Sequence, residues 1–232
     1  MSLSPSDSGT DLRSLLSSVR RVVIKVGTNV IMRDDGGVAI GRIYGLVEAV
    51  ANLRKDGKEV MLVSSGAVGL GAQRLGLKKK PHLLPIKQAC AAIGQSSLMA
   101  IYEQGFDKLG VITAQVLLTE DDFSTRRRYL NLRTALEKTM ELGAVPIINE
   151  NDTVSTLELG GSDEASAHKP IFGDNDKLSA LVMSKVSADL LVLLSDVDGL
   201  YTANPRKDAK AELMPVVREI TPEIEAIAEG AG

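Results

Sequence analysis

The chain has 232 residues, 44% of them hydrophobic, which is enough to bury one sizeable core in a single domain. Its formal net charge is −3 and its pI is about 5.5, a balance that argues against the basic surface of a nucleic-acid-binding protein. No apolar run approaches the ~18 residues that a membrane-spanning helix needs. The single cysteine, Cys90, excludes an intrachain disulfide and suits a reducing compartment, so we expect a cytoplasmic protein.

Residues 1–18 are rich in serine and lack a long apolar stretch, so we expect a flexible tail ahead of a domain over 19–232. From residue 21 onward, strand-like and helix-like segments alternate. In chain order we expect a strand at 21–27, a helix at 38–57, a strand at 58–66, a helix at 84–110, a strand at 111–119, a helix at 126–143, a strand at 144–152, a helix at 174–188 and a strand at 189–199.

The expected strands are nearly continuous apolar runs, which is typical of parallel strands buried on both faces. Alternation of such strands with helices predicts an α/β fold, a three-layer α/β/α sandwich with a mainly parallel central sheet. The one long stretch without a regular pattern is 153–173, and loops of that length are usually lids, binding loops or disordered segments.

Polar or glycine-rich residues follow nearly every expected strand. In open parallel sheets, ligands bind beyond the carboxyl ends of the strands, so these residues are candidates for one shared site. They are Lys25 with Gly27, Thr28 and Asn29 after the first strand, Ser64, Ser65 and Gly66 after the second, Asn149 to Asp152 after the fourth, and Ser195, Asp196 and Asp198 after the last.

Lys25 lies two residues before Gly27, and residues two apart in a strand share one face of the sheet. A cation beside a glycine turn suits phosphoryl transfer, where positioning and charge stabilisation do most of the catalytic work. Known phosphate motifs do not fit, however. The stretch GAQRLGLK from Gly71 has leucine where a P-loop needs lysine, and no GxGxxG follows the first strand.

The stretch FGDNDKLSALV near residue 172 combines a helix start with a polar cluster. Asp174 is a good N-cap, and acidic residues in the first turn suit the helix dipole. If the helix begins near the polar strand ends, Asn175 and Asp176 gain partners there. Capping and a role in the site are therefore compatible.

Eight stretches between about residues 20 and 220 together resemble the glutamate 5-kinases, a branch of the amino-acid kinase superfamily that also supplies the kinase domain of pyrroline-5-carboxylate synthetase. They read VVIKVGTNV, VMLVSSGAVGLG, KQACAAIGQSSLM, AQVLLT, RYLNLRTAL, VPIINENDTVST, FGDNDKLSALV and LLVLLSDVDGLYTANPR. The combination of INEND, GDND and SDVDGLYTANP is specific to this branch. The related carbamate, acetylglutamate, uridylate and aspartate kinases share the lysine-glycine start but not that combination.

The resemblance implies the amino-acid kinase fold, with a glutamate-binding part over about 19–185 and the start of a nucleotide-binding part over about 186–232. It implies transfer of the ATP γ-phosphate, with Mg²⁺, to the side-chain carboxylate of L-glutamate, the first step of proline biosynthesis. It further implies proline as a feedback inhibitor and a homo-oligomer, a dimer or tetramer. The small-residue-rich helix near 85–109 would suit close packing between subunits.

The resemblance also implies a role for each candidate residue. The catalytic residues are Lys25, which would stabilise the transferring phosphoryl group, and Asp176, which would organise that lysine. Glutamate would be bound by Ser65, Asp152 and Asn175, and the nucleotide by Lys25, Gly27, Ser195 and Asp196. No protein metal site is expected, because His82 and His168 lie far apart and have no ligand spacing.

Family members continue into a glycine-rich segment that carries a second cation, whereas this chain ends at Gly232. We therefore expect a C-terminally truncated form of the fold. Two alternatives stay open: a non-catalytic module that binds glutamate or proline, and another amino-acid kinase of the same superfamily.

Overall fold

The computed structural model describes residues 14–77, 79, 81–154 and 175–230, within which the chain forms two compact units. One unit spans Arg20–Leu194. The other combines residues up to Val19 with residues from Ser195 onward. The expected loop at 153–173, the N-cap Asp174 and His168 lie outside the described residues, apart from positions 153 and 154.

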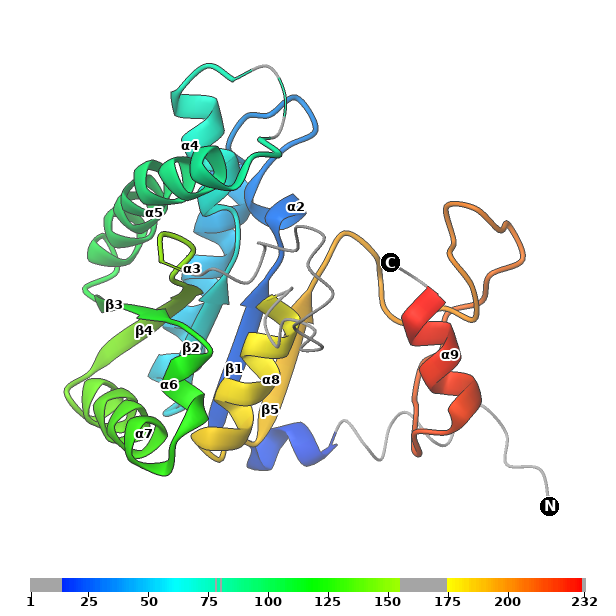
Figure 1. Ribbon diagram of the computed structural model, residues 1–232. Helices are drawn as coiled ribbons and strands as arrows, with labels where there is room; N and C mark the ends of the chain where they lie inside the picture. The colour runs from blue at the N-terminus through cyan, green and yellow to red at the C-terminus, as the bar shows by residue number, and fades with distance from the viewer. Residues whose placement is uncertain (1–13, 78, 80, 155–174, 231–232) are drawn as a thin grey trace. The chain divides into compact units, whose positions relative to one another are not determined.

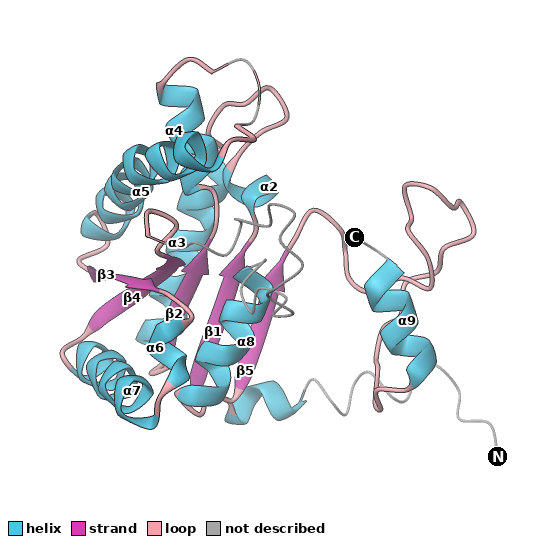
Figure 2. Ribbon diagram, in the orientation of Figure 1, coloured by secondary structure: helices cyan, strands magenta, loops and turns pink. Residues whose placement is uncertain are grey.

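The unit Arg20–Leu194 is built on one five-stranded sheet in which every paired strand is parallel (Figures 1 and 2). The strand order is β3-β4-β2-β1-β5. The strands are β1 (Arg21–Val26), β2 (Glu59–Ser64), β3 (Ile112–Leu118), β4 (Ala144–Glu150) and β5 (Leu190–Leu194). The predicted parallel α/β architecture is confirmed, and all five expected strands are present.

Helices cover both faces of this sheet, as the three-layer prediction requires. In Figure 1, α7 and α8 lie in front of the sheet and α3 lies behind it. The helices of this unit are α2 (Thr28–Ile31), α3 (Ile40–Lys55), α4 (Ala67–Arg74), α5 (Leu84–Asp107), α6 (Asp121–Ser124), α7 (Arg126–Glu141) and α8 (Asn175–Lys185). The sequence did not predict α2, α4 or α6, of which two are single turns.

The three inner strands are buried along almost their whole length, as continuous apolar runs predict. Their side chains on the α8 face join one core cluster with Leu178 and Val182 of α8. Burial on both faces is wrong for β3, where Ile112 is 66% exposed. The same prediction is wrong for β5, where Leu193 is 53% exposed. β3 and β5 are the two edge strands of the sheet, each with a single neighbour, so part of their surface faces solvent.

Helix α4 forms in a glycine-rich stretch because its glycines let it approach α5 closely. A methyl group at Gly71 would overlap the backbone of Cys90, and one at Gly94 would overlap the backbone of Ala67. Cys90 is buried in this contact, as expected for a small hydrophobic residue. The small residues of α5 therefore pack within one chain, against α4.

Asp189 aligns the starts of β1 and β5. Its Oδ2 accepts hydrogen bonds from the backbone N–H groups of Arg20 and Arg21, each at 2.8 Å. These two donors hold the pKa of the Asp189 carboxyl below its ordinary value. Its own backbone N–H donates to the carbonyl of Arg21 at 2.9 Å, so Asp189 joins the two strands through both side chain and backbone.

The second unit contains a short 3-10 helix, η1 (Leu15–Ser18), and a helix that the sequence did not predict, α9 (Pro222–Gly230). Between them in sequence, Tyr201 and Leu213 form an isolated antiparallel bridge. Within the described residues, no helix is both long enough and apolar enough to cross a membrane.

Candidate active site

Lys25 and Asp176 form an ion pair at the carboxyl end of the sheet. Val23 belongs to the core cluster under α8, and Lys25, two residues further along β1, shares that face of the sheet. Its ammonium Nζ lies 2.7 Å from Oδ1 of Asp176, the second residue of α8. Lys25 is 9% exposed, whereas the Asp176 side chain is 43% exposed. A nearly buried cation is therefore held by a carboxylate that still reaches solvent.

Gly27 keeps the space beside this ammonium open. A Cβ at position 27 would lie 3.6 Å from Nζ of Lys25 and 3.2 Å from the carbonyl oxygen of Leu194. The backbone N–H of Gly27 already donates to that carbonyl at 3.2 Å. Gly27 therefore matters to Lys25 mainly because it has no side chain. Its backbone N–H is already used in the bond to Leu194.

Asn175, the first residue of α8, ties this helix to the ends of two strands. The two hydrogens of its Nδ2 are shared among three acceptors: Oγ of Ser65 at 2.8 Å, the carbonyl of Ser64 at 3.2 Å and Oδ1 of Asn149 at 3.1 Å. Ser64 ends β2, and Asn149 is the penultimate residue of β4. Among the described residues, no donor reaches the other side-chain atom, Oδ1 of Asn175, which is therefore left to accept from a ligand.

Two buried polar residues of α5 support the same strand ends from the opposite side of the sheet. Oε1 of Gln95 accepts from Nδ2 of Asn149 at 2.9 Å. Two turns further along α5, the hydroxyl of Tyr102 lies 3.0 Å from Oγ of Ser64. Burial raises the pKa of Tyr102 to about 12, against a smaller lowering effect of the Ser64 hydrogen bond.

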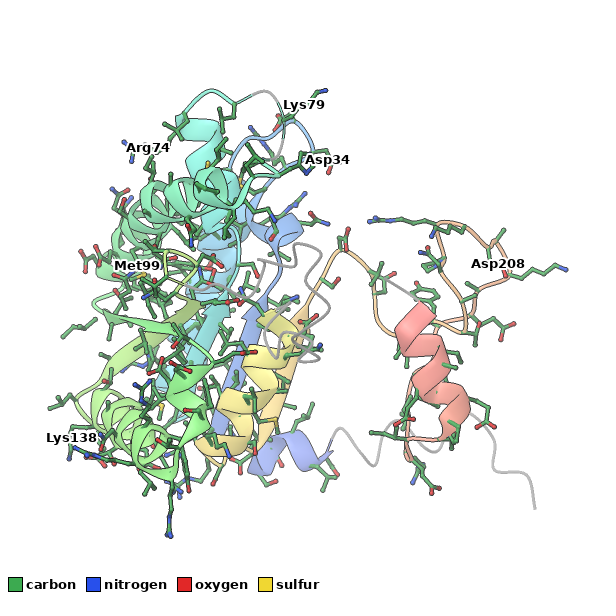
Figure 3. All side chains as sticks on the ribbon, in the orientation of Figure 1. Asp34, Arg74, Lys79, Met99, Lys138 and Asp208 are labelled. Carbon is green, nitrogen blue, oxygen red and sulfur yellow. The ribbon has the colours of Figure 1, made fainter. Side chains whose placement is uncertain are left out.

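A cleft of about 1190 Å³ opens over these strand ends. Its lining includes Ser65, Asn149, Asp152 and Asn175, together with the first turn of α4 and the loop between α2 and α3. Figure 3 labels Asp34 and Lys79, which both line the outer end of this cleft. The cleft is several times larger than one amino acid, so it has room for a second group beside a bound one.

Helix α4 starts at the floor of this cleft and presents unpaired backbone N–H groups there. Its N-cap, Gly66, has φ +100°, a left-handed conformation that favours glycine, and a Cβ there would press on Ile31 at 3.2 Å. The first intrahelical N–H donor is Leu70, so the N–H groups of 67–69 stay available at the positive end of the helix dipole. This helix start can bind a carboxylate or a phosphate.

Six of the residues predicted for the site meet at this edge of the sheet, with Gly27 beside the Lys25 ammonium. Lys25 pairs with Asp176, and Asn175 bonds to Ser65. Asp152 lines the same cleft. These contacts place the residues but do not test their roles, which stay predictions.

The other two predicted site residues belong to the second unit of the chain. They are Ser195 and Asp196, and Oδ2 of Asp196 pairs with Nη2 of Arg206 at 2.5 Å. Their assignment to the nucleotide also stays a prediction.

Sequence reasoning missed Gln95 and Tyr102, and it noted Asn149 only as a strand end. In sequence, Gln95 and Tyr102 look like ordinary positions of a long helix, so no local pattern could have identified them. Asn149 had a usable signal, because it occupies the end of a buried strand in the stretch INEND.

Among the described residues, no group of three histidine, cysteine, aspartate or glutamate side chains could hold a metal ion. Mg²⁺ does not need such a group, since it is commonly bound by one or two carboxylates together with substrate phosphates. Asp176 beside Lys25 is a carboxylate of the right kind for that arrangement.

Comparison with known proteins places this chain in a family. The model of the amino acid kinase family matches residues 20–230. Glutamate 5-kinase of Moorella thermoacetica is 50% identical over 222 residues, which cover 96% of this chain and 56% of that protein. Those of Trichlorobacter lovleyi and Myxococcus xanthus are each 49% identical over 95% and 94% of this chain, and 56% and 55% of their own lengths. The chain therefore spans about half the length of these curated relatives.

Solved structures with the same fold are more distant in sequence. UMP kinase from Ureaplasma parvum is 15% identical with a TM-score of 0.54, covering 92% of this chain and 87% of that one. Isopentenyl phosphate kinase of T. acidophilum, in a product complex, is 18% identical with a TM-score of 0.56, covering 90% and 84%. The parallel sheet, the buried lysine at its carboxyl edge and the match over residues 20–230 agree: the chain belongs to the amino acid kinase family.

Proposed function

We propose that the chain transfers the γ-phosphate of ATP to the side-chain carboxylate of L-glutamate, giving glutamyl 5-phosphate and ADP. The proposal rests on two neighbouring residues at the start of α8. Asn175 bonds to Ser65 in the cleft, and Asp176 holds the Lys25 ammonium at 2.7 Å. One helix start thus places an amino-acid-binding group directly beside a cation suited to phosphoryl transfer. The relatives named glutamate 5-kinase support this choice of substrate.

The cleft offers a complementary group for each charge of a bound amino acid. The Asp152 carboxylate and Oδ1 of Asn175 suit the ammonium group, which can only donate hydrogen bonds. The N–H groups at the start of α4 suit the α-carboxylate. Because Oγ of Ser65 accepts from Asn175, its own proton is left to donate to a carboxylate oxygen.

Phosphoryl transfer to a carboxylate needs cations more than it needs a base. The glutamate side chain is already ionised at neutral pH, so no proton is removed before attack. One carboxylate oxygen bonds to the γ-phosphorus while the bond from that phosphorus to the β-phosphate oxygen breaks. Two like charges at ~4 Å repel by roughly 4 kcal/mol at intermediate dielectric, and the Lys25 ammonium offsets this repulsion. Asp176 fixes the direction of that ammonium.

Mg²⁺ bound to the nucleotide would neutralise further phosphate charge. Ser195 and Asp196 are proposed to contact the nucleotide. By the same likeness to glutamate 5-kinases, we infer a cytoplasmic enzyme at the first step of proline biosynthesis, with proline as its inhibitor and with homo-oligomeric assembly.

A substrate panel tests this proposal on the full chain. Calorimetry would compare L-glutamate with glutarate, which lacks the ammonium group, with 4-aminobutyrate, which lacks the α-carboxylate, and with L-aspartate, which is one methylene shorter. We expect L-glutamate to bind at least about tenfold more tightly than each of the others, since glutarate and 4-aminobutyrate each lack one charged group that the cleft would bind, and aspartate is too short for both of its carboxylates to reach their places.

Turnover is measured separately, by ADP release and by trapping the acyl phosphate with hydroxylamine as a hydroxamate. Hydroxamate formed with glutamate and ATP supports the proposal. ADP release with aspartate or carbamate but not with glutamate would replace it with another activity of the family. Glutamate binding without hydroxamate would reduce the function of this chain to ligand binding.

A further inference from the structure

Gln95 is buried beside the site with only half of its amide satisfied. The residue is 8% exposed and lies on α5, one turn before Met99, which Figure 3 labels. Its Oε1 accepts from Nδ2 of Asn149 at 2.9 Å. Its Nε2 has no hydrogen-bond partner among the described residues. A buried donor without an acceptor is destabilising, so packing alone would favour an apolar residue of similar length, such as methionine, at this position.

Backbone groups dictate the orientation of the amides next to Gln95. The N–H of Glu150 can only donate, and it donates to Oδ1 of Asn149 at 2.9 Å. The carbonyl of Ser64 can only accept, and it accepts from Nδ2 of Asn175 at 3.2 Å. Oδ1 of Asn149 must then face Asn175, and Nδ2 of Asn149 must face α5.

Gln95 supplies the acceptor that this arrangement requires. Without Oε1 of Gln95, the buried Nδ2 of Asn149 would lose the one acceptor that it has among the described residues. No orientation of the Asn149 amide would then satisfy it: in the present one Nδ2 stays unpaired, and rotation would turn Nδ2 toward two donors, the N–H of Glu150 and Nδ2 of Asn175, and would take Oδ1 away from Asn175. Asn175 would then be held less firmly, and the direction of its own Oδ1 would no longer be fixed.

We propose that Gln95 is a positioning residue, which acts through Asn149 to hold the Asn175 amide with its oxygen available to the ammonium group of an amino acid. The identity of that ligand rests on the proposed function, whereas the orientation of the amides does not. Gln95 itself touches no substrate in this scheme. The glutamine amide that provides this acceptor also brings a buried N–H group without a partner, which destabilises the fold.

Gln95→Met tests the proposal, because it removes the acceptor and keeps the length of the side chain. We expect the dissociation constant of L-glutamate, measured by calorimetry, to rise about tenfold, which corresponds to the loss of one well-placed hydrogen bond. The melting temperature should change little, since one unsatisfied buried donor is removed while another is created. An unchanged affinity would overturn the proposal.

Tyr102→Phe is the matched control, since it removes another buried hydrogen bond between α5 and a strand end. Its effect on glutamate affinity should stay within about twofold, an amount corresponding to well under 1 kcal/mol. If both variants weaken glutamate binding equally, α5 acts through general packing and the assignment to Gln95 is wrong.

A double-mutant cycle with Asn149→Ala tests the route of action. If Gln95 acts through Asn149, adding Gln95→Met to Asn149→Ala should change glutamate affinity by less than about twofold. Additive effects of the two substitutions would show that Gln95 acts by some other route and would overturn the proposal.

Nuclear magnetic resonance separates failure of this inference from failure of the proposed function. The side-chain amide signals of Asn149 and Asn175 report their orientation without any ligand. We expect both to shift and to exchange faster with water in Gln95→Met than in the unmodified chain. Should the unmodified chain bind no glutamate, the proposed function fails, and these signals still decide the role of Gln95. Unmoved Asn175 signals would overturn that role.

Discussion

Nζ of Lys25 lies 2.7 Å from Oδ1 of Asp176, so the fifth residue of β1 and the second residue of α8 form one ion pair. Substituting Lys25→Met removes the cation that we propose meets the transferring phosphoryl group. We expect turnover to fall about 10²-fold or more, equivalent to roughly 3 kcal/mol of transition-state stabilisation, with glutamate affinity changed by less than about threefold. Hydroxamate formation and calorimetry measure the two quantities.

Lys185→Met provides the control for that variant. Lys185 is at the last turn of α8, where its ammonium lies 4.8 Å from the ring centre of Tyr129, so the same chemical change is made on the helix but away from the cleft. It should leave turnover unchanged. Full turnover in Lys25→Met would contradict the role given to Lys25.

Asp152→Asn removes the carboxylate proposed to bind the substrate ammonium while keeping the shape of the side chain. We expect glutamate affinity to fall about 10- to 100-fold, as for the loss of a charge-assisted hydrogen bond, with the affinity for glutarate nearly unchanged. Asp34→Asn makes the same substitution at the outer end of the same cleft, and its effect should be within about twofold. Equal losses in both variants would indicate a general effect of cleft charge.

Gly94→Ala should destabilise the chain strongly, because the added methyl group would overlap the backbone of Ala67 at the contact between α4 and α5. Overpacking of this kind costs about 3 kcal/mol, which outweighs the gain of about 1 kcal/mol in helix propensity. Gly45→Ala is the matched control, since position 45 is an exposed helix position of α3 with open space around it. It should stabilise the chain by about 0.5–1 kcal/mol. Urea unfolding followed by circular dichroism distinguishes the two variants.

Asp189 should make stability depend on pH at the acid end. Its pKa is lowered in the folded chain by the N–H groups of Arg21 and Arg20, so the carboxylate stabilises the fold above its unfolded pKa of 3.8. That contribution is lost as the pH falls through the lower folded pKa. Asp189→Asn should therefore lose stability at pH 6 and show a flatter decline between pH 5 and pH 3, about the range over which a carboxyl titrates. Urea midpoints measured across this pH range give the stability of both proteins. If the two plots of stability against pH run parallel, the prediction is wrong.

The sequence predicted the sheet well because its strands are continuous apolar runs. Such runs can be recognised in the sequence without any knowledge of long-range contacts. It also placed Lys25, Ser65 and Asn175 at one edge, because parallel strands end on the same side of a sheet. It missed α4, since glycine normally weakens a helix, and the close contact with α5 that compensates for this involves residues distant in sequence. Gln95 was missed for the same reason: its significance lies in its contact with Asn149, which is distant in sequence.

β1 pairs with one strand on each side, and the ribosome synthesises these two strands at very different times. It pairs with β2 through contacts such as Val22 with Val60, and with β5 through contacts such as Val22 with Leu190. While the chain emerges from the ribosome, one edge of β1 must stay unpaired until residues 190–194 appear. Such an exposed edge invites misfolding and slows folding, since long-range parallel pairs form late. The strand that carries Lys25 is thus among the first to be synthesised, but its pairing with β5 forms last.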